Sequence, residues 1–268
     1  MVARPDAVQR VASRVRRLAA EYEPPSFDHV PDPDAAIFLC AIDHKSGYRG
    51  RYLVGGRGPF EGSALLWAVG LRAAERHPGL LMAARLREAG ADEVGELFRI
   101  GGETVADPER RAGLWRDLAA GLERDHEGDA AALLATAGGR LGGGSGLLAL
   151  LARYRAYSDP LQKKSLLFAK IAARRGWLRV ADPECWEVCS DSVLMRLALR
   201  SGLVQPDSLE EVRSATREVF AEVALAAELS PPVLDDLLWE LGRDDPNLLG
   251  TEGGDLHEPP RDPASAWY

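Results

Sequence analysis

Residues 158–204 read SDPLQKKSLLFAKIAARRGWLRVADPECWEVCSDSVLMRLALRSGLV and contain two helix signals. The first starts at Asp159-Pro160, a capping residue followed by a proline suited to a first helical turn, and ends at Gly176. Its apolar residues at helical spacing are Leu167, Phe168 and Ile171. Lys164 lies on the same face of this helix, so we expect its ammonium group to point toward a desolvated region.

The second signal predicts a helix over residues 192–200, closed by Gly202. Asp191 stands at its N-cap position, where backbone N–H groups and the positive end of the helix favour an ionised carboxylate. An inward lysine followed by a carboxylate at a helix start is the arrangement from which we develop the functional hypotheses.

The composition indicates a soluble globular protein. The chain has 268 residues and 46% apolar content, enough for a full core, and no run of 18 apolar residues that would predict a membrane span. Its N-terminus has no continuous apolar stretch typical of a signal peptide, so we expect a cytoplasmic protein with no membrane partner. The net charge of −8 disfavours a surface that holds duplex DNA through many phosphates.

The cysteines predict no metal site. Cys185 and Cys189 have no second pair and no nearby histidine to complete four ligands, and Cys40 stands alone. We therefore expect reduced core thiols and no cofactor.

Apolar periodicity predicts helices along most of the chain. The expected helices cover residues 6–22, 61–76, 80–89, 92–100, 108–124, 129–136, 146–157, 209–229 and 231–242. Residues 35–42 form a continuous apolar run that fits either a buried helix or a buried strand, and residues 48–58 fit a short strand or hairpin. Without alternation of strands and helices, the fold class is all-α, with at most a small β-hairpin.

Two motifs in the first stretch resemble a known superfamily. QKKSLLFAKIA and SDSVLMRL resemble the lysine and aspartate helices of the helix-hairpin-helix DNA glycosylases, particularly the archaeal oxidised-guanine branch. The match places Lys164 at that branch's lysine and Asp191 at its aspartate.

A second resemblance covers residues 37–244 in collinear order, to the queuosine-nucleotide N-glycosylases of queuine salvage. The similar segments are AIDHKSGY, RYLVGGRGPFEGSALLWAVGLRA, SDSVLMRLALRSGLV and LDDLLWELGRD. The resemblance implies a two-lobed helical architecture like that of DNA glycosylases, with a lead-in over residues 1–34, a glycosylase-like domain over 35–244 and an irregular tail over 245–268. It also implies a substrate pocket that contains Asp43.

The two catalytic candidates are Asp191 and Lys164. Cleavage of a C1′–N bond develops positive charge on the ribose, so Asp191 is expected to stabilise this charge and orient water, although a plain helix cap also fits the sequence. Lys164 fits a Schiff-base nucleophile if the substrate is DNA. For a free nucleotide, Lys163 or Lys164, with Arg174 or Arg175, would instead hold the phosphate, and a structural lysine fits as well.

The candidate substrate-binding residues follow apolar segments. Asp43 and His44 would contact the base edge, although a loop acid is also a common turn former. Trp67 or Trp239 would stack on a base or belong to the core, and Asp235 and Asp236 would line the pocket or lie on a polar helix face.

These residues lead to three functional hypotheses. The first is an N-glycosidase that hydrolyses a modified purine-type (7-deazaguanine-like) nucleotide or nucleoside, a small-molecule partner. The second is a DNA glycosylase/AP lyase that excises oxidised guanine through Lys164. The third is a non-catalytic nucleotide-binding or interaction protein on the same fold.

Overall fold

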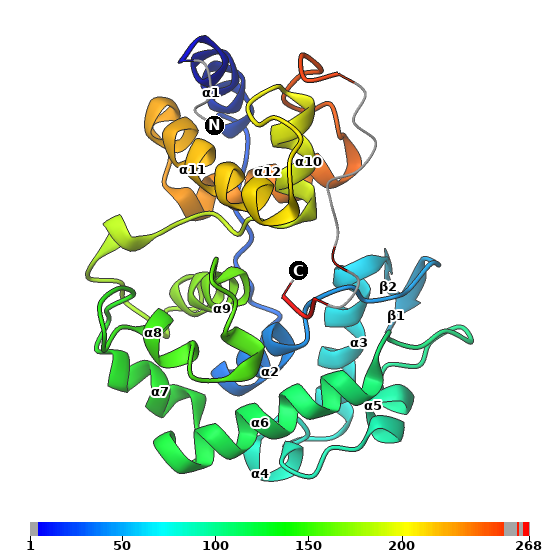
Figure 1. Cartoon of the computed structure of the whole chain (residues 1–268). Coiled ribbons are helices and arrows are strands. Elements are labelled where there is room, and N and C mark those ends of the chain that lie inside the picture. The colour runs from blue at the N-terminus through cyan, green and yellow to red at the C-terminus, as the bar shows by residue number, and fades with distance from the viewer. Residues whose placement is uncertain (1–4, 255–261, 263–264, 268) are drawn as a thin grey trace. The chain divides into compact units, whose positions relative to one another are not determined.

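The protein is mainly α-helical, as the sequence predicts. The computed structural model describes residues 5–254, 262 and 265–267. These residues form twelve α-helices and one two-stranded antiparallel sheet (Figure 1). In this part of the chain, no helix combines the length and the apolar content that crossing a bilayer requires. Of the tail expected to be irregular, the described residues 245–254, 262 and 265–267 contain neither helix nor strand. Its residues 255–261, 263–264 and 268 lie outside the described part.

The contacts divide the described residues into two compact units. Unit 1 contains residues 5–26, 184–254, 262 and 265, and unit 2 contains residues 27–183 and 266–267. These boundaries differ from those expected at residues 34 and 244, because the first helix, α1 (Pro5–Ala19), packs against the late helix α11 (Leu209–Ala227).

Unit 1 is a helical bundle around an apolar core. Besides α1 and α11 it contains α10 (Ser192–Arg200) and α12 (Pro231–Asp244), which pack against each other. The predicted apolar face of α1 is buried at Val8, Val11 and Val15. They share one core cluster with Leu194, Leu197, Phe220, Val223, Leu234 and Leu237.

Unit 2 is built around α2 (Pro33–Ala41). This helix contains the apolar run whose sequence pattern fits either a buried helix or a buried strand. Residues 35–41 are all at most 2% exposed, because α3 (Gly62–Arg76), α6 (Pro108–His126), α7 (Ala130–Ala137) and α9 (Lys163–Arg174) pack against it. Asp32 caps this helix by accepting a hydrogen bond from Ala35 N at 2.7 Å. A helix buried on all sides has no polar face, so it shows no helical period.

Helix α6 makes close contacts with α2 and with Tyr154. Trp115 Nε1 donates to the α2 carbonyl of Phe38 at 2.7 Å. Gly121 faces Tyr154 so closely that a Cβ at this position would lie 2.4 Å from Tyr154 Cε1. The absence of a side chain at Gly121 therefore allows the tyrosine ring to pack on the helix.

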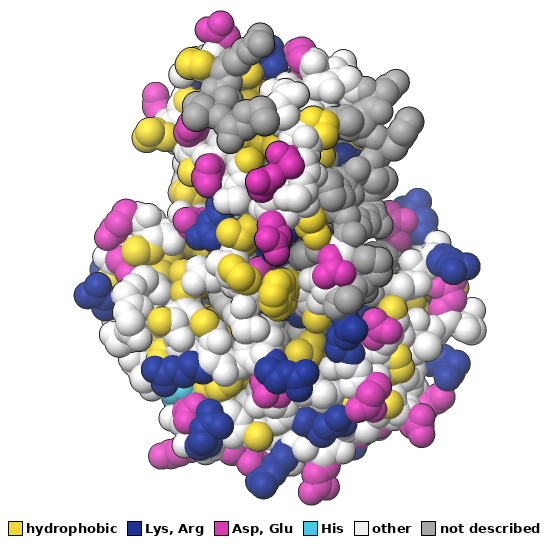
Figure 2. Space-filling model, in the orientation of Figure 1, with side chains coloured by type: hydrophobic (Ala, Val, Ile, Leu, Met, Phe, Trp, Pro, Cys, Tyr) yellow, Lys and Arg dark blue, Asp and Glu magenta, His cyan; other side chains and the backbone are white. Residues whose placement is uncertain are grey.

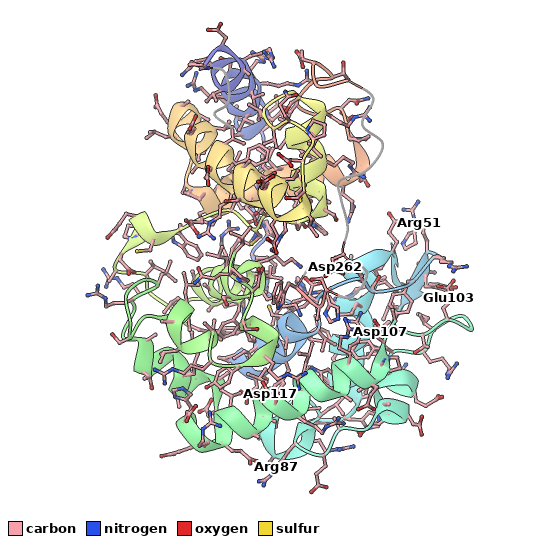
Figure 3. All side chains as sticks on the ribbon, in the orientation of Figure 1. Arg51, Arg87, Glu103, Asp107, Asp117 and Asp262 are labelled. Atoms are coloured by element: carbon pink, nitrogen blue, oxygen red, sulfur yellow. The ribbon has the colours of Figure 1, made fainter. Side chains whose placement is uncertain are left out.

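The expected hairpin is present as β1 (Tyr52–Val54) and β2 (Arg57–Phe60), which pair antiparallel. Glu103 lies beside it, as Figure 3 shows together with Arg51 at the start of the hairpin. One Glu103 oxygen accepts from Arg49 N at 2.7 Å and the other accepts from the Tyr52 hydroxyl at 2.9 Å. This carboxylate therefore fixes the base of the hairpin.

Three predicted helices differ from the structure. The helix expected over residues 80–89 is only α4 (Ala83–Leu86), followed after a short loop by α5 (Ala91–Leu97). The helix expected over residues 146–157 breaks into α8 (Leu147–Leu151) and a 3₁₀ turn (Arg155–Tyr157), and a second 3₁₀ turn (Pro183–Cys185) precedes α10. Helix α9 starts at Lys163 rather than at Asp159-Pro160.

Candidate functional site

The start of α9 brings two lysines to the interior of unit 2. Asp159 acts before the helix, where its carboxylate oxygens accept hydrogen bonds from Leu161 N at 3.1 Å and Lys163 N at 3.2 Å. Gln162 adopts a left-handed conformation with φ of 55° between them, so the proline turn is a loop and not a helical turn. The helix then begins with Lys163 and Lys164, both of which are buried.

Lys164 is completely enclosed, as the sequence predicts. Its side chain is 0% exposed, and Nζ donates to Ala41 O at 2.5 Å and lies 3.1 Å from His44 Nδ1. Burial lowers the pKa of this amine well below its usual value, and the positive charge of Lys163 lowers it further. Lys164 therefore joins the end of α2 to the loop that follows it.

Lys163 forms a buried contact with Asp43. Its Nζ donates to Asp43 O at 3.0 Å and lies 3.4 Å from the carboxylate oxygen Oδ2. The two residues are 8% and 7% exposed. In such a weakly solvated place their attraction is much stronger than at the surface, although both groups also lose their hydration.

Arg111 from α6 holds the loop that carries Asp43 and His44. It is 0% exposed and donates to four backbone carbonyls: Ala106 and His44, both at 2.6 Å, Lys45 at 2.8 Å, and Ile42. Burial lowers its pKa to about 10. Arg111 is not among the site residues predicted from the sequence, yet its spacing from Trp115, Leu118 and Leu122 places it on the buried stripe of the helix.

His44 is buried with one ring nitrogen satisfied. The residue is 5% exposed, and burial together with the charges of Lys164 and Arg111 keeps its pKa far below the usual value, so the ring is neutral at physiological pH. Nδ1 contacts Lys164, whereas Nε2 is buried and has no hydrogen-bond partner among the described residues. We refer to Asp43, His44, Lys163 and Lys164, with Arg111 beneath their loop, as the lysine cluster.

Asp191 lies in unit 1 and caps α10 as predicted. Its Oδ1 accepts hydrogen bonds from Val193 N at 2.9 Å and Leu194 N at 3.0 Å. The residue is only 8% exposed. Two other aspartate caps of this chain, Asp32 and Asp129, are exposed and each accept one such bond from the helix that they start. Burial therefore distinguishes Asp191 from these ordinary caps.

Asp235 anchors the segment that leads to Asp191. Its Oδ1 accepts from Cys189 N at 2.7 Å, and the next residue, Ser190, donates its hydroxyl to Arg213 O at 2.8 Å. Asp235 is 3% exposed. Asp235 therefore positions the backbone before Asp191, a role that differs from the pocket lining or polar helix face that the sequence predicts.

The two candidate tryptophans are half-buried and lie in different units. Trp239 on α12 packs against the unit 1 core, with the guanidinium carbon of Arg243 5.3 Å from the centre of its ring. Trp67 lies on α3 of unit 2. Arg175, a candidate phosphate ligand, forms an ion pair with Asp28 at 2.7 Å.

Two hollows of unit 2 are lined by residues outside the lysine cluster. They have volumes of about 520 and 490 Å³ and are lined by residues 77–80, 85, 93, 96 and 97 and by residues 33, 131, 134, 135, 138, 139 and 177–179. On the face drawn in Figure 2, basic and acidic side chains are interspersed over unit 2. In the described part of the chain, no group of three or more His, Cys, Asp or Glu side chains could hold a metal ion.

The fold and these clusters define a mainly α-helical protein with a buried lysine–histidine–aspartate cluster in one unit and a buried capping aspartate in the other. No protein-family model matches the sequence, and no curated protein matches it either. The resemblance to helix-hairpin-helix glycosylases therefore stays a prediction based on the motifs alone.

Proposed function

We propose that this chain is an N-glycosidase that hydrolyses the bond between the base and the ribose of a modified purine-type, 7-deazaguanine-like nucleotide or nucleoside. The observation that supports it most is the burial of Asp191, which is 8% exposed while Oδ1 accepts two backbone hydrogen bonds. A cap needs no burial, as the exposed Asp32 and Asp129 illustrate. A buried, oriented carboxylate is what an oxocarbenium-like transition state requires.

In this proposal, Asp191 stabilises the positive charge that develops on the ribose and orients the attacking water. The bond between C1′ and the base nitrogen breaks, water supplies a hydroxyl group to C1′, and its proton leaves with the base. The stabilisation is larger for a carboxylate with little solvent around it, because water screens the interaction less.

The lysine cluster supports the recognition of a small anionic ligand. It concentrates the cationic groups of Lys163 and Arg111 and the amine of Lys164 around one carboxylate, that of Asp43, in a chain whose net charge is −8. Within unit 2, Lys163 fits an anionic oxygen of such a ligand, and Asp43 and His44 fit its other polar groups. The weight of acidic residues elsewhere favours a small nucleotide over a long nucleic acid.

The test is the release of free base from a panel of nucleosides and nucleoside 5′-monophosphates, followed by mass spectrometry. Asp191→Asn is the informative variant, because asparagine is as good a helix cap as aspartate but carries no charge. Asp129→Asn is its matched control at an exposed cap. Base release by the wild type and the control, lost in Asp191→Asn, supports the proposal, and equal rates in all three contradict it.

One observation favours a second function, that of a DNA glycosylase/AP lyase. The lowered pKa of Lys164 provides the unprotonated amine that attack on C1′ and Schiff-base formation require. The complete burial of this amine disfavours the second function, because a nucleophile has to reach C1′ of the substrate. Borohydride treatment with abasic or oxidised-guanine duplex would trap a covalent adduct that Lys164→Met loses. Tight nucleotide binding without turnover of either substrate would instead indicate the non-catalytic nucleotide-binding protein.

A further inference from the structure

His44 has one ring nitrogen in contact with Lys164 and another, also buried, that meets no partner among the residues that the structure describes. Nδ1 lies 3.1 Å from Lys164 Nζ, and Nε2 is buried without a hydrogen bond among the described residues. Buried polar atoms are rarely left in this state, and a neutral imidazole must carry its proton on one of the two nitrogens. The partner at Nδ1 decides what Nε2 can bind.

We infer that Lys164 is a positioning residue that fixes His44 as the Nε2–H tautomer, and that this N–H is the donor by which unit 2 recognises an acceptor oxygen of a purine-type ligand. The inference deepens the proposed function and rests on it only for the kind of ligand. Lys164 acts through His44 and touches no substrate itself.

The hydrogen bonds around Lys164 support Nζ as the donor to His44 Nδ1. Its Nζ has two neighbours, Ala41 O at 2.5 Å and His44 Nδ1 at 3.1 Å. The carbonyl can only accept, so Nζ donates to it. A charged amine then has a second N–H for Nδ1, whereas a neutral amine can either donate a second N–H or accept from an Nδ1–H through its lone pair. We infer the arrangement in which Nζ donates, and ¹⁵N NMR of the histidine rings distinguishes the two. With Nδ1 as acceptor, the ring proton lies on Nε2.

The surrounding charge favours an oxygen as the partner of Nε2–H. Lys163 and Arg111 are both buried next to the His44 loop, with Asp43 as the carboxylate among them. Such a positive environment stabilises an electron-rich carbonyl or anionic oxygen and disfavours another donor. The exocyclic oxygen of a guanine-type base has this character.

The loop holds the ring in place before any ligand binds. Arg111 donates to the carbonyl groups of Ile42, His44 and Lys45, and to Ala106 O beyond them. Fixing the backbone on both sides of His44 leaves its side chain few alternatives. Such a fixed ring lowers the ordering cost of binding, and the groups that cover the buried Nε2 must move for a ligand to reach it.

The tautomer is tested directly by ¹⁵N NMR of the histidine rings. The sequence has five histidines, and His44→Gln assigns the signals of His44. We expect a protonated Nε2 and an unprotonated Nδ1 in the wild type, and a mixture of tautomers in Lys164→Met. An Nδ1–H form, a charged ring, or an unchanged spectrum in Lys164→Met would overturn the inference.

The recognition is tested by the affinity for guanosine 5′-monophosphate and for the 5′-monophosphate of 2-aminopurine riboside, which lacks the exocyclic oxygen. His44→Gln keeps a donor near the position of Nε2, whereas His44→Asn keeps only polar atoms near Nδ1. We expect the wild type and His44→Gln to prefer the guanosine nucleotide by about 10-fold, the loss typical of one unmade hydrogen bond. His44→Asn should lose this preference.

The control for these variants is His77→Gln, at an exposed histidine. A wild type that binds neither nucleotide, or a His44→Asn variant that keeps the preference, would contradict the recognition. Failure of the proposed function is a separate result, because absence of base release changes neither the NMR signals nor the difference in affinity.

Discussion

Replacement of Lys164 by methionine should change how the stability of the protein depends on pH. The amine is 0% exposed, and its pKa in the folded state lies well below the usual value of 10.5. Between these two pKa values the unfolded chain holds a proton that the folded chain lacks. Folding then releases a proton, so the free energy of unfolding rises with pH in this window.

The size of the effect follows from a difference of one bound proton between the folded and unfolded states. The free energy of unfolding of the wild type should rise relative to that of Lys164→Met by about 1.4 kcal/mol for each pH unit inside the window. Other groups that titrate there, such as Cys40 and Tyr157 with their raised pKa values, are present in both proteins and largely cancel in the difference. Methionine fills a similar volume without a charge.

The measurement is urea unfolding of both proteins, followed by tryptophan fluorescence, at pH 7, 8 and 9. Equal m-values would show that both unfold to similar states, so that the midpoints report stability. A difference in free energy that grows with pH is the expected result. A difference that stays constant from pH 7 to 9 would mean that Lys164 keeps its proton in the folded protein, and would refute the reasoning.

Three further predictions concern other parts of the structure. The pKa of His44 is lowered in the folded state, so between that pKa and 6.5 the unfolded state binds a proton that the folded state lacks. As the pH falls below 6.5, the free energy of unfolding of the wild type should therefore decrease by up to about 1.4 kcal/mol per pH unit relative to that of His44→Gln. Urea-unfolding stabilities of the two proteins that run parallel with pH would contradict this. Gly121→Ala should destabilise by about 1–3 kcal/mol through its clash with Tyr154. Gly113→Ala in the same helix is the control, because a Cβ at this position would lie 3.8 Å from the nearest side-chain atom, and it should be neutral or stabilising by up to about 1 kcal/mol. Equal urea midpoints for the two variants would refute the packing argument. Asp182→Ala should lower the free energy of unfolding by about 1–3 kcal/mol, because this buried carboxylate accepts hydrogen bonds from Leu141 N at 2.8 Å and Gly142 N at 2.9 Å. An unchanged melting temperature would contradict this role.

Local sequence signals predicted the elements whose ends are set by nearby residues. Helix α10 runs from Ser192 to Arg200 as expected, because Asp191 caps it and Gly202, with φ of 73°, follows its end. The inward direction of Lys164 also follows from spacing within one helix. Both features depend on residues a few positions apart, which pattern analysis can detect.

The features that were missed depend on contacts between distant segments. Helix α2 has no polar face, because other helices cover it on every side, so its class was undecided. The pairing of Lys164 with His44 joins residues 120 positions apart and requires α9 to pack on α2. Arg111 was overlooked because an arginine is normally exposed, although four backbone carbonyls satisfy it here.

The rate of base release by Asp191→Asn tests the central claim most directly. The wild type and Asp129→Asn, compared on the same nucleotide at equal concentration, provide the reference, and circular dichroism checks that all three are folded. The account predicts a rate at least about 100-fold lower for Asp191→Asn, since loss of a group that stabilises charge in the transition state typically costs this much. A rate for Asp191→Asn within a few-fold of the wild type would show that Asp191 is only a helix cap, and would contradict the proposed function.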